Sequence, residues 1–121
     1  MHRLTLVLPV LVMAAACDEA PPQATLKEIP AAFLGNWDSV GECGGGGARS
    51  VTVTPTEVTF PDSKIAVTGV APDGATAARV DGHFTSTDAQ WDGSLRLELA
   101  SGGNELNVVN GSSLTPRVKC S

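Results

Sequence analysis

Residues 94–100, SLRLELA, decide the fold class of this chain. Leu95, Leu97 and Leu99 alternate with polar or small residues, and this two-residue period is typical of a β-strand with one buried face. Shorter runs of the same kind occur at 51–54, 57–60, 64–68 and 105–109. Beyond the N-terminal apolar run, no window of the sequence has apolar residues at helical spacing. We therefore predict an all-β protein.

Turn residues separate these runs at short intervals, with Asp73-Gly74 and Asn110-Gly111 as clear examples. Seven or eight strands are predicted, at about 34–40, 49–54, 57–60, 64–71, 76–85, 94–100, 105–109 and 113–119. Short consecutive strands favour an antiparallel meander, and a meander that closes on itself has no free edges. We expect a small antiparallel up-and-down β-barrel, with a two-sheet β-sandwich as the alternative.

Composition limits the classes of function that remain open. The 121 residues suffice for one domain. A formal charge of −5 and an aromatic content of 4% argue against nucleic-acid binding, which requires a basic face and, for single strands, aromatic stacking platforms. The 3 cysteines are an odd number, so internal disulfides alone do not account for them.

The N-terminal residues 1–17, MHRLTLVLPVLVMAAAC, have the features of an export signal. Arg3 supplies a positive charge, and the uncharged run at 4–16 would extend about 20 Å as a helix, less than the hydrocarbon core of about 30 Å. The run ends in Ala14-Ala15-Ala16-Cys17, which resembles the lipobox of bacterial lipoproteins. Soluble secretion after cleavage at the same site and an uncleaved anchor are the alternatives.

The lipobox resemblance implies a domain organisation and a location. Acyl chains such as palmitate on Cys17 would form a stable lipid anchor, because more than one chain is attached. The expected organisation is a signal peptide at 1–16, a lipidated N-terminus and flexible tether at 17–30, and a barrel domain at 31–121. The protein would then lie in the cell envelope and face the periplasm, and Asp18 is similar to an inner-membrane retention signal.

With Cys17 assigned to the lipid, Cys43 and Cys120 remain, and a pair of cysteines in an oxidising compartment predicts a disulfide. Such a bridge would join the end of the first strand to the end of the last. A metal site is not expected, because His83 is the one histidine after the signal and no two cysteines lie close in sequence.

Gly35-Asn36-Trp37, at the start of the first predicted strand, resembles the G-x-W motif of lipocalins and related calycins. The resemblance implies that Trp37 seals one end of the barrel and that a basic residue near the end of the last strand, here Arg117, packs across it. Small β-barrel protease inhibitors among the bacterial lipoproteins also combine a lipobox, a G-x-W-like strand and one disulfide.

Single residues outside these motifs supply no catalytic set. His83 is expected to face solvent beside Asp81, and the glycines at 44–47 form a flexible connection rather than a phosphate cradle. Trp91 is predicted to lie in a polar turn before the strand at 94–100. There it either covers a barrel end or is exposed as a possible contact for a partner.

These observations favour a membrane-anchored envelope lipoprotein with a non-enzymatic binding domain, which holds a small ligand or an envelope protein and acts as a monomer. The alternative is an inhibitor of a protease or other hydrolase. An enzyme is the least favoured reading, since no nucleophile, acid and base can be assembled, and no cofactor is expected.

Overall fold

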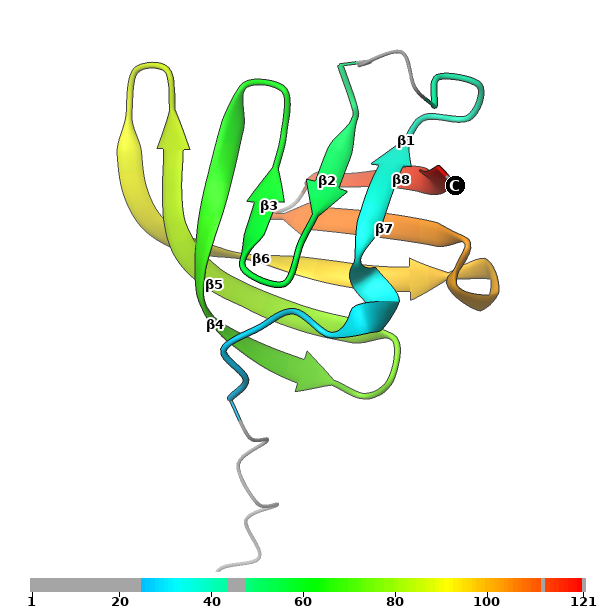
Figure 1. Cartoon of the computed structure of the whole chain (residues 1–121), viewed down its shortest axis with the longest axis horizontal. Helices are drawn as coiled ribbons and strands as arrows, with labels where there is room; N and C mark the ends of the chain where they lie inside the picture. The colour runs from blue at the N-terminus through cyan, green and yellow to red at the C-terminus, as the bar shows by residue number, and fades with distance from the viewer. Residues whose placement is uncertain (1–24, 44–47, 112, 121) are drawn as a thin grey trace, which may run out of the picture.

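The computed structural model describes residues 25–43, 48–111 and 113–120. Its strands are β1 (Gly35–Asp38), β2 (Val51–Val53), β3 (Glu57–Thr59), β4 (Ser63–Asp73), β5 (Ala77–Ser86), β6 (Gln90–Ala100), β7 (Glu105–Asn110) and β8 (Ser113–Cys120). Each strand pairs antiparallel with the next, and β8 returns to pair with β1, so the sheet closes into a barrel (Figure 1). The predicted up-and-down β-barrel is confirmed, and the β-sandwich is not the architecture.

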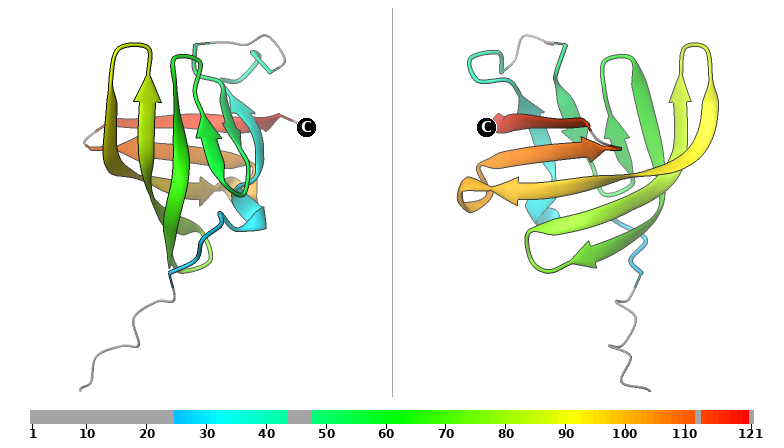
Figure 2. Two further views of the ribbon diagram at one scale, coloured as in Figure 1. Left: turned by 60° about the vertical axis from the view of Figure 1, so that its left-hand side comes forward. Right: turned by 180° about the vertical axis from the view of Figure 1, so that it is seen from behind.

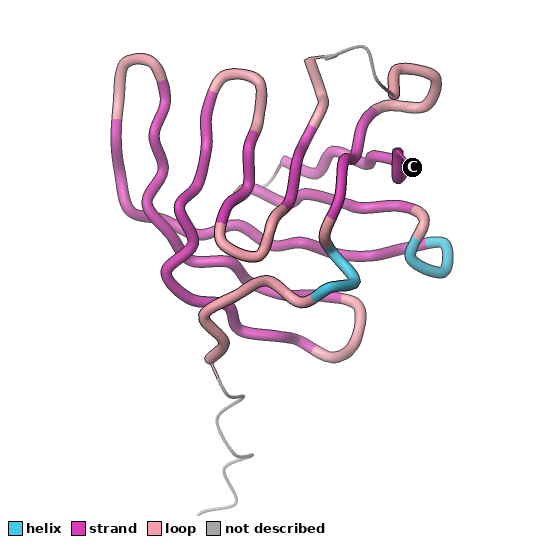
Figure 3. Tube along the Cα trace, viewed as in Figure 1, coloured by secondary structure: helices cyan, strands magenta, loops and turns pink. Residues whose placement is uncertain are grey.

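Short 3-10 segments are the helical parts of the described residues (Figure 3). The first, η1 (Ala31–Phe33), precedes β1, and the second, η2 (Ser101–Gly103), connects β6 to β7. No helix within these residues has the length and apolar character needed to cross a membrane.

The largest difference from the predicted strands is the start of β6. The strand begins at Gln90 rather than at residue 94, so the prediction that Trp91 lies in a turn is wrong. Gly93 and its polar neighbours interrupt the apolar alternation and resemble a turn in the sequence. Pairing with β5 nevertheless continues through this stretch, with Phe84 opposite Trp91.

Side chains that point inward fill the barrel. An eight-stranded barrel has an interior just wide enough to be filled in this way. The largest fully buried side chains are those of Trp37, Ile65, Leu97, Leu106, Val51, Val58, Val70 and Val80. The interior is therefore a hydrophobic core that most strands share.

Trp37 fastens one end of the barrel. Its indole Nε1 donates a hydrogen bond of 3.0 Å to the carbonyl of Phe33, the last residue of η1. The backbone N–H of Ile29 donates to the carbonyl of Pro55, at 2.8 Å, in the turn between β2 and β3. The segment before β1 is thus held across this end, which we call the closed end.

Gly82 permits the close approach of strands where the long strands β4 to β6 bend. Gly82 on β5 lies opposite Gly93 on β6, and the register between β4 and β5 shifts between Val67 and Gly69. A Cβ atom on Gly82 would lie 2.4 Å from the carbonyl oxygen of Ala66, so only glycine fits there. Beyond the bend, the β5–β6 hairpin curves away from the barrel body (Figure 2).

The two ends of the barrel carry different parts of the chain. The segment from residue 25 to η1 lies at the closed end, and the backbones of Leu26 and Val70 exchange two hydrogen bonds of 2.8 Å there. The turns of the β3–β4 and β5–β6 hairpins lie at the opposite end, which we call the open end (Figure 1).

Cys43 and Cys120 form the predicted disulfide, and their Cα atoms lie 5.5 Å apart. The bridge joins the loop after β1 to the last residue of β8, and its two cysteines are 77 positions apart in sequence. It therefore covalently fastens the strand pair that closes the barrel.

Candidate functional site

The β5–β6 hairpin carries an exposed tryptophan at the open end. Trp91 is 45% exposed, while the other aromatic residues of the described chain are buried or half-buried. Its ring stacks on that of Phe84, with centroids 5.4 Å apart and an angle of 22° between the planes. Phe84 is only 4% exposed, so the stack links the exposed indole to the hydrophobic core. Trp91 is therefore held in a defined position rather than projecting freely.

Gly93 lies beside this stack. A Cβ atom at this position would lie 3.4 Å from carbon atoms of both the Phe84 and the Trp91 rings. The glycine that interrupts the sequence pattern thus borders the two aromatic rings, and an alanine there would make ordinary van der Waals contact with them. The alternation places Phe84, Trp91 and Leu95 on the face of the sheet that continues into the core.

His83 lies on the outer face of the same hairpin, opposite Asp92. Its Nδ1 lies 2.9 Å from Asp92 Oδ1, and its Nε2 lies 3.1 Å from Gln90 Oε1. When the ring is protonated, both nitrogens donate, so the bond to Asp92 and then the bond to Gln90 raise the pKa of His83 above its ordinary value of 6.5. The partner of His83 is therefore the carboxylate across the strand pair.

This arrangement does not activate a nucleophile. A histidine that activates a nucleophile acts as a general base, and one of its ring nitrogens accepts the proton of a hydroxyl or thiol. In His83 one ring nitrogen faces Asp92 and the other faces Gln90. Within the parts of the chain that the structure describes, no three His, Cys, Asp or Glu side chains come close enough to hold a metal ion.

Two basic residues of β8, the exposed Lys119 and the buried Arg117, take different positions from the one that the lipocalin resemblance implies. Trp37 lies opposite Lys119, whose Nζ is 5.7 Å from the centroid of the indole ring. Arg117 lies instead over the ring of Phe60, with its Cζ 5.9 Å from the ring centroid. The cation across Trp37 is thus Lys119, because the register of β8 against β1 brings that residue to the tryptophan.

Arg117 connects β8 to the chain that enters β2. It is only 8% exposed, and its guanidinium donates hydrogen bonds to the carbonyls of Arg49 and Thr115. Burial, followed by the nearby Arg49 charge, lowers the pKa of Arg117, and Asp38 acts in the opposite direction. The side chain therefore serves to position the loop after β1.

The first half of β6 has an unpaired backbone edge, which the sequence pattern did not indicate. The Ser86 N–H donates a hydrogen bond of 2.9 Å to the Ala89 carbonyl. This bond determines which residues of β6 direct their backbone N–H and C=O groups toward β5. Because hydrogen-bonding directions alternate along a strand, the backbone groups of Gln90, Asp92 and Ser94 point away from β5. On that side β7 pairs with β6 only from Arg96 onward. Among the described residues, no strand pairs with this edge.

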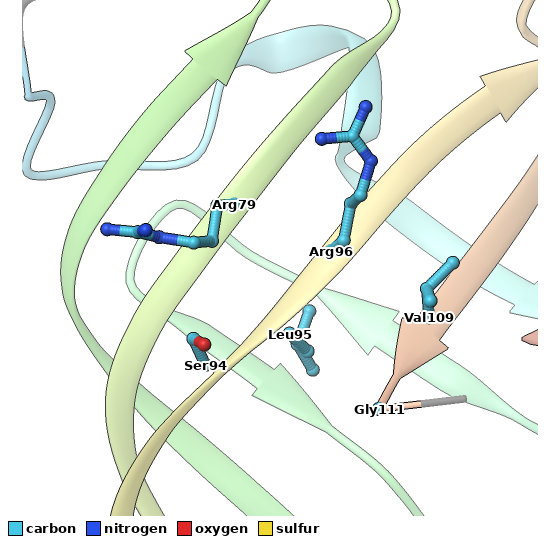
Figure 4. A pocket seen from close by; sticks show the side chains of 6 residues that line it. All are labelled: Arg79, Ser94, Leu95, Arg96, Val109 and Gly111. Carbon is cyan, nitrogen blue, oxygen red and sulfur yellow. The ribbon is translucent and has the colours of Figure 1, made fainter. Parts of the chain in front are cut away.

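A pocket of about 280 Å³ lies where β6 and β7 separate (Figure 4). It is lined by Arg79, Ser94, Leu95, Arg96, Val109 and Gly111. The two arginine side chains extend in different directions, as Figure 4 shows.

Both arginines of this pocket are engaged by carboxylates of the protein. Arg79 pairs with Asp81 at 3.2 Å, and Arg96 pairs with Asp73 at 2.8 Å and with Glu98 at 2.7 Å. The positive charges of the pocket are therefore already paired, so it is not a site for an anion. It is an open space beside the free edge of β6.

Several predicted features lie outside the described residues, namely Cys17, Asp18 and the glycines at 44–47. The chain matches no protein-family model, and no curated protein and no solved structure is significantly similar to it. A small eight-stranded antiparallel barrel with one disulfide fits a lipocalin-like architecture, and the likeness is one of architecture.

Proposed function

We propose that this protein is a lipid-anchored lipoprotein of the bacterial cell envelope whose barrel is a non-enzymatic binding domain. In this proposal the open end of the barrel binds a partner, and the β5–β6 hairpin supplies the main contact. The observation that carries the proposal is the exposed Trp91, which stacks on a core residue and lies at the start of β6, beside the β5–β6 turn of the open end.

The position of the N-terminal segment supports this orientation. The chain enters the barrel at the closed end, where Leu26 pairs with Val70. A lipid on Cys17 would hold the protein through this segment, only eight positions before the first described residue, Thr25. The open end with Trp91 would then be directed away from the membrane, toward the periplasm.

The energetics of the exposed indole support a binding role. Large aromatic side chains dominate the energy of many interfaces, and tryptophan is enriched at the positions that contribute most. Since Trp91 is already fixed by its stack on Phe84, little conformational entropy is lost when a partner covers it. The side chains that fill the interior favour a macromolecular partner over a small ligand enclosed in the barrel.

A second candidate function, inhibition of a protease or other hydrolase, is favoured by the curvature of the β5–β6 hairpin away from the barrel (Figure 2). A projecting hairpin is a shape that can enter an active-site cleft. Loss of hydrolase activity in proportion to added protein would distinguish this function from simple binding.

Two measurements test the proposal. Acyl labelling of the full chain should occur and should disappear in Cys17→Ser; labelling that persists would contradict the anchor. Affinity capture from the native membrane should then show one specific partner whose recovery falls at least tenfold in Trp91→Ala.

The matched control is Leu26→Ala, which removes an exposed apolar side chain at the closed end and should leave recovery unchanged. Equal recovery with Trp91→Ala and Leu26→Ala would contradict the assignment of the open end. Thermal unfolding of both variants verifies that the barrel is intact.

A further inference from the structure

We propose that the free edge of β6 at Gln90, Asp92 and Ser94 is a strand-addition site, where an extended segment of a partner polypeptide with a central basic residue pairs with the barrel. This inference rests on the proposed binding function and specifies its partner and its mode. The first half of β6 forms the outer side of the curved hairpin, as Figure 2 shows in the view from behind.

The edge presents hydrogen-bonding groups in a regular row. Gln90, Asp92 and Ser94 each direct one N–H and one C=O away from β5, and all three residues are exposed. Their spacing of two residues corresponds to about 7 Å along an extended chain. A segment of about five residues would therefore satisfy these groups by adding one strand, which is an established mode of peptide recognition.

The other long strand with an exposed side, β4, has its edge covered. Both backbone groups of Val70 are bonded to Leu26, and Pro72, two residues farther along the same edge, has no N–H to offer. Proteins commonly protect edges by such devices. The edge of β6 has neither a covering segment among the described residues nor a proline.

The side chains at the edge specify the chemistry of the partner. On the outer face the Asp92 side chain is 91% exposed, and within the described part of the chain only its Oδ1 is bonded, to His83. Because residues directly opposite in a sheet share a face, a lysine or arginine opposite Asp92 would pair with this carboxylate. The neighbours of that residue point to the inner face, where an apolar side chain would contact Trp91.

A second copy of this chain fits the edge poorly. A twofold antiparallel pairing centred on the edge would place two Asp92 carboxylates directly opposite each other, and like charges in that position are destabilising. Moving the centre toward the C-terminal end of β6 would bring the partner onto Arg96, which already pairs with Val109 of β7. A pairing centred on Trp91 would avoid both problems but would place the uncharged Gln90 opposite Asp92. A different polypeptide with a basic residue at that position therefore fits the edge better.

The probe for this site is the pentapeptide acetyl-Thr-Val-Lys-Val-Thr-amide, added to the full mature chain and followed by backbone amide NMR. The amide signals of Gln90, Asp92 and Ser94 should shift most, and their hydrogen exchange should slow at least tenfold. A peptide with Glu in place of Lys should bind at least threefold more weakly. Exchange protection of these amides without peptide would mean that the chain covers its own edge, which overturns the proposal.

Backbone methylation of the peptide supplies a control that leaves the protein unchanged. In the proposed antiparallel pairing, the N–H of the lysine opposite Asp92 faces β6, whereas the N–H groups of the two valines face away. N-methylation of the lysine should therefore reduce affinity at least tenfold, and N-methylation of one valine should have little effect. Equal effects of the two methylations would overturn strand addition.

Protein variants separate this inference from the proposed function. Ser94→Pro removes one edge donor without breaking the pairing with β5, and Ser94→Ala retains that donor. Peptide binding should be lost in the first variant and retained in the second. If capture of the natural partner requires Trp91 but is the same in both Ser94 variants, strand addition is wrong and the binding function stands. If the edge binds the peptide but native membranes yield no partner that depends on Trp91, the binding function fails instead.

Discussion

Replacing Gly82 with alanine tests whether the bend in strands β4 to β6 sets the position of the binding hairpin. The added Cβ would lie 2.4 Å from the carbonyl oxygen of Ala66 and 2.7 Å from Cγ2 of Ile65. Because the backbone of Ala66 cannot move aside as a flexible side chain can, β4 and β5 must separate or their bend must change. Overpacking of this kind costs about 1–3 kcal/mol, and contact with backbone places the expected loss of unfolding free energy near about 3 kcal/mol.

The matched control lies directly across the strand pair. In Gly93→Ala the new Cβ meets ring atoms at 3.4 Å, which is ordinary van der Waals contact. Because alanine also restricts the unfolded chain, this variant should unfold within about 1 kcal/mol of the wild type. For a domain of this size, about 3 kcal/mol corresponds to a fall in Tm of at least about 12 °C.

Urea and thermal unfolding, followed by tryptophan fluorescence and circular dichroism, measure the difference between the two variants. A change in unfolding free energy of Gly82→Ala below about 0.5 kcal/mol, which is typical of surface substitutions, would refute the packing argument. An equal loss in both variants would refute it as well, since only Gly82 contacts backbone.

Three further predictions concern the disulfide and the side chains of the hairpin. The double variant Cys43→Ser, Cys120→Ser should lose up to about 4.5 kcal/mol of unfolding free energy, because the bridge closes a long loop; denaturation that is unchanged without the bridge would contradict this. NMR titration of His83 should give a pKa above 6.5, and Asp92→Asn should lower it. Because the pKa of His83 is raised in the folded state, the stability contributed by the His83–Asp92 pair is complete below about pH 6.5 and is lost as the pH rises through the folded pKa. A His83 pKa at or below 6.5 would be inconsistent with the hydrogen bonds. Acrylamide should quench the tryptophan fluorescence of the wild type. The Trp91→Phe variant should lose nearly all of this quenchable signal, because Trp37 is fully buried. Strong quenching in that variant would place Trp37 in contact with solvent.

The pattern of residue types along the chain is sufficient to predict much of the barrel. The alternation of Leu95, Leu97 and Leu99 identifies the second half of β6, and the remaining cysteine pair identifies the bridge that fastens its ends. Both are properties of residue type and spacing along the chain, so they can be recognised before any contact is known.

Features that depend on the register between paired strands cannot be predicted from the sequence in the same way. Whether Lys119 or Arg117 covers Trp37 depends on how β8 pairs with β1, and a shift of the register changes which residue arrives there. The sequence pattern predicts a turn at Trp91 because Gly93 interrupts the alternation, whereas β6 continues through this stretch and pairs with β5 there.

The free edge of β6 is likewise a property of two strands together. It exists because β6 continues past the point at which β7 ends, at Asn110. Neither strand alone contains that information, and the polar residues along the edge resemble those of an ordinary solvated strand. The candidate site could therefore be recognised only from the paired structure.

Photo-crosslinking from the open end tests the central claim most directly. A benzophenone side chain placed at position 88 of the membrane-anchored protein, in the β5–β6 turn beside Trp91, should give one major adduct with a partner, and the same group at position 26 should give none. Adducts of equal yield from both positions, or none from position 88 in cells that contain the anchored protein, would contradict the account of the hairpin as the binding surface.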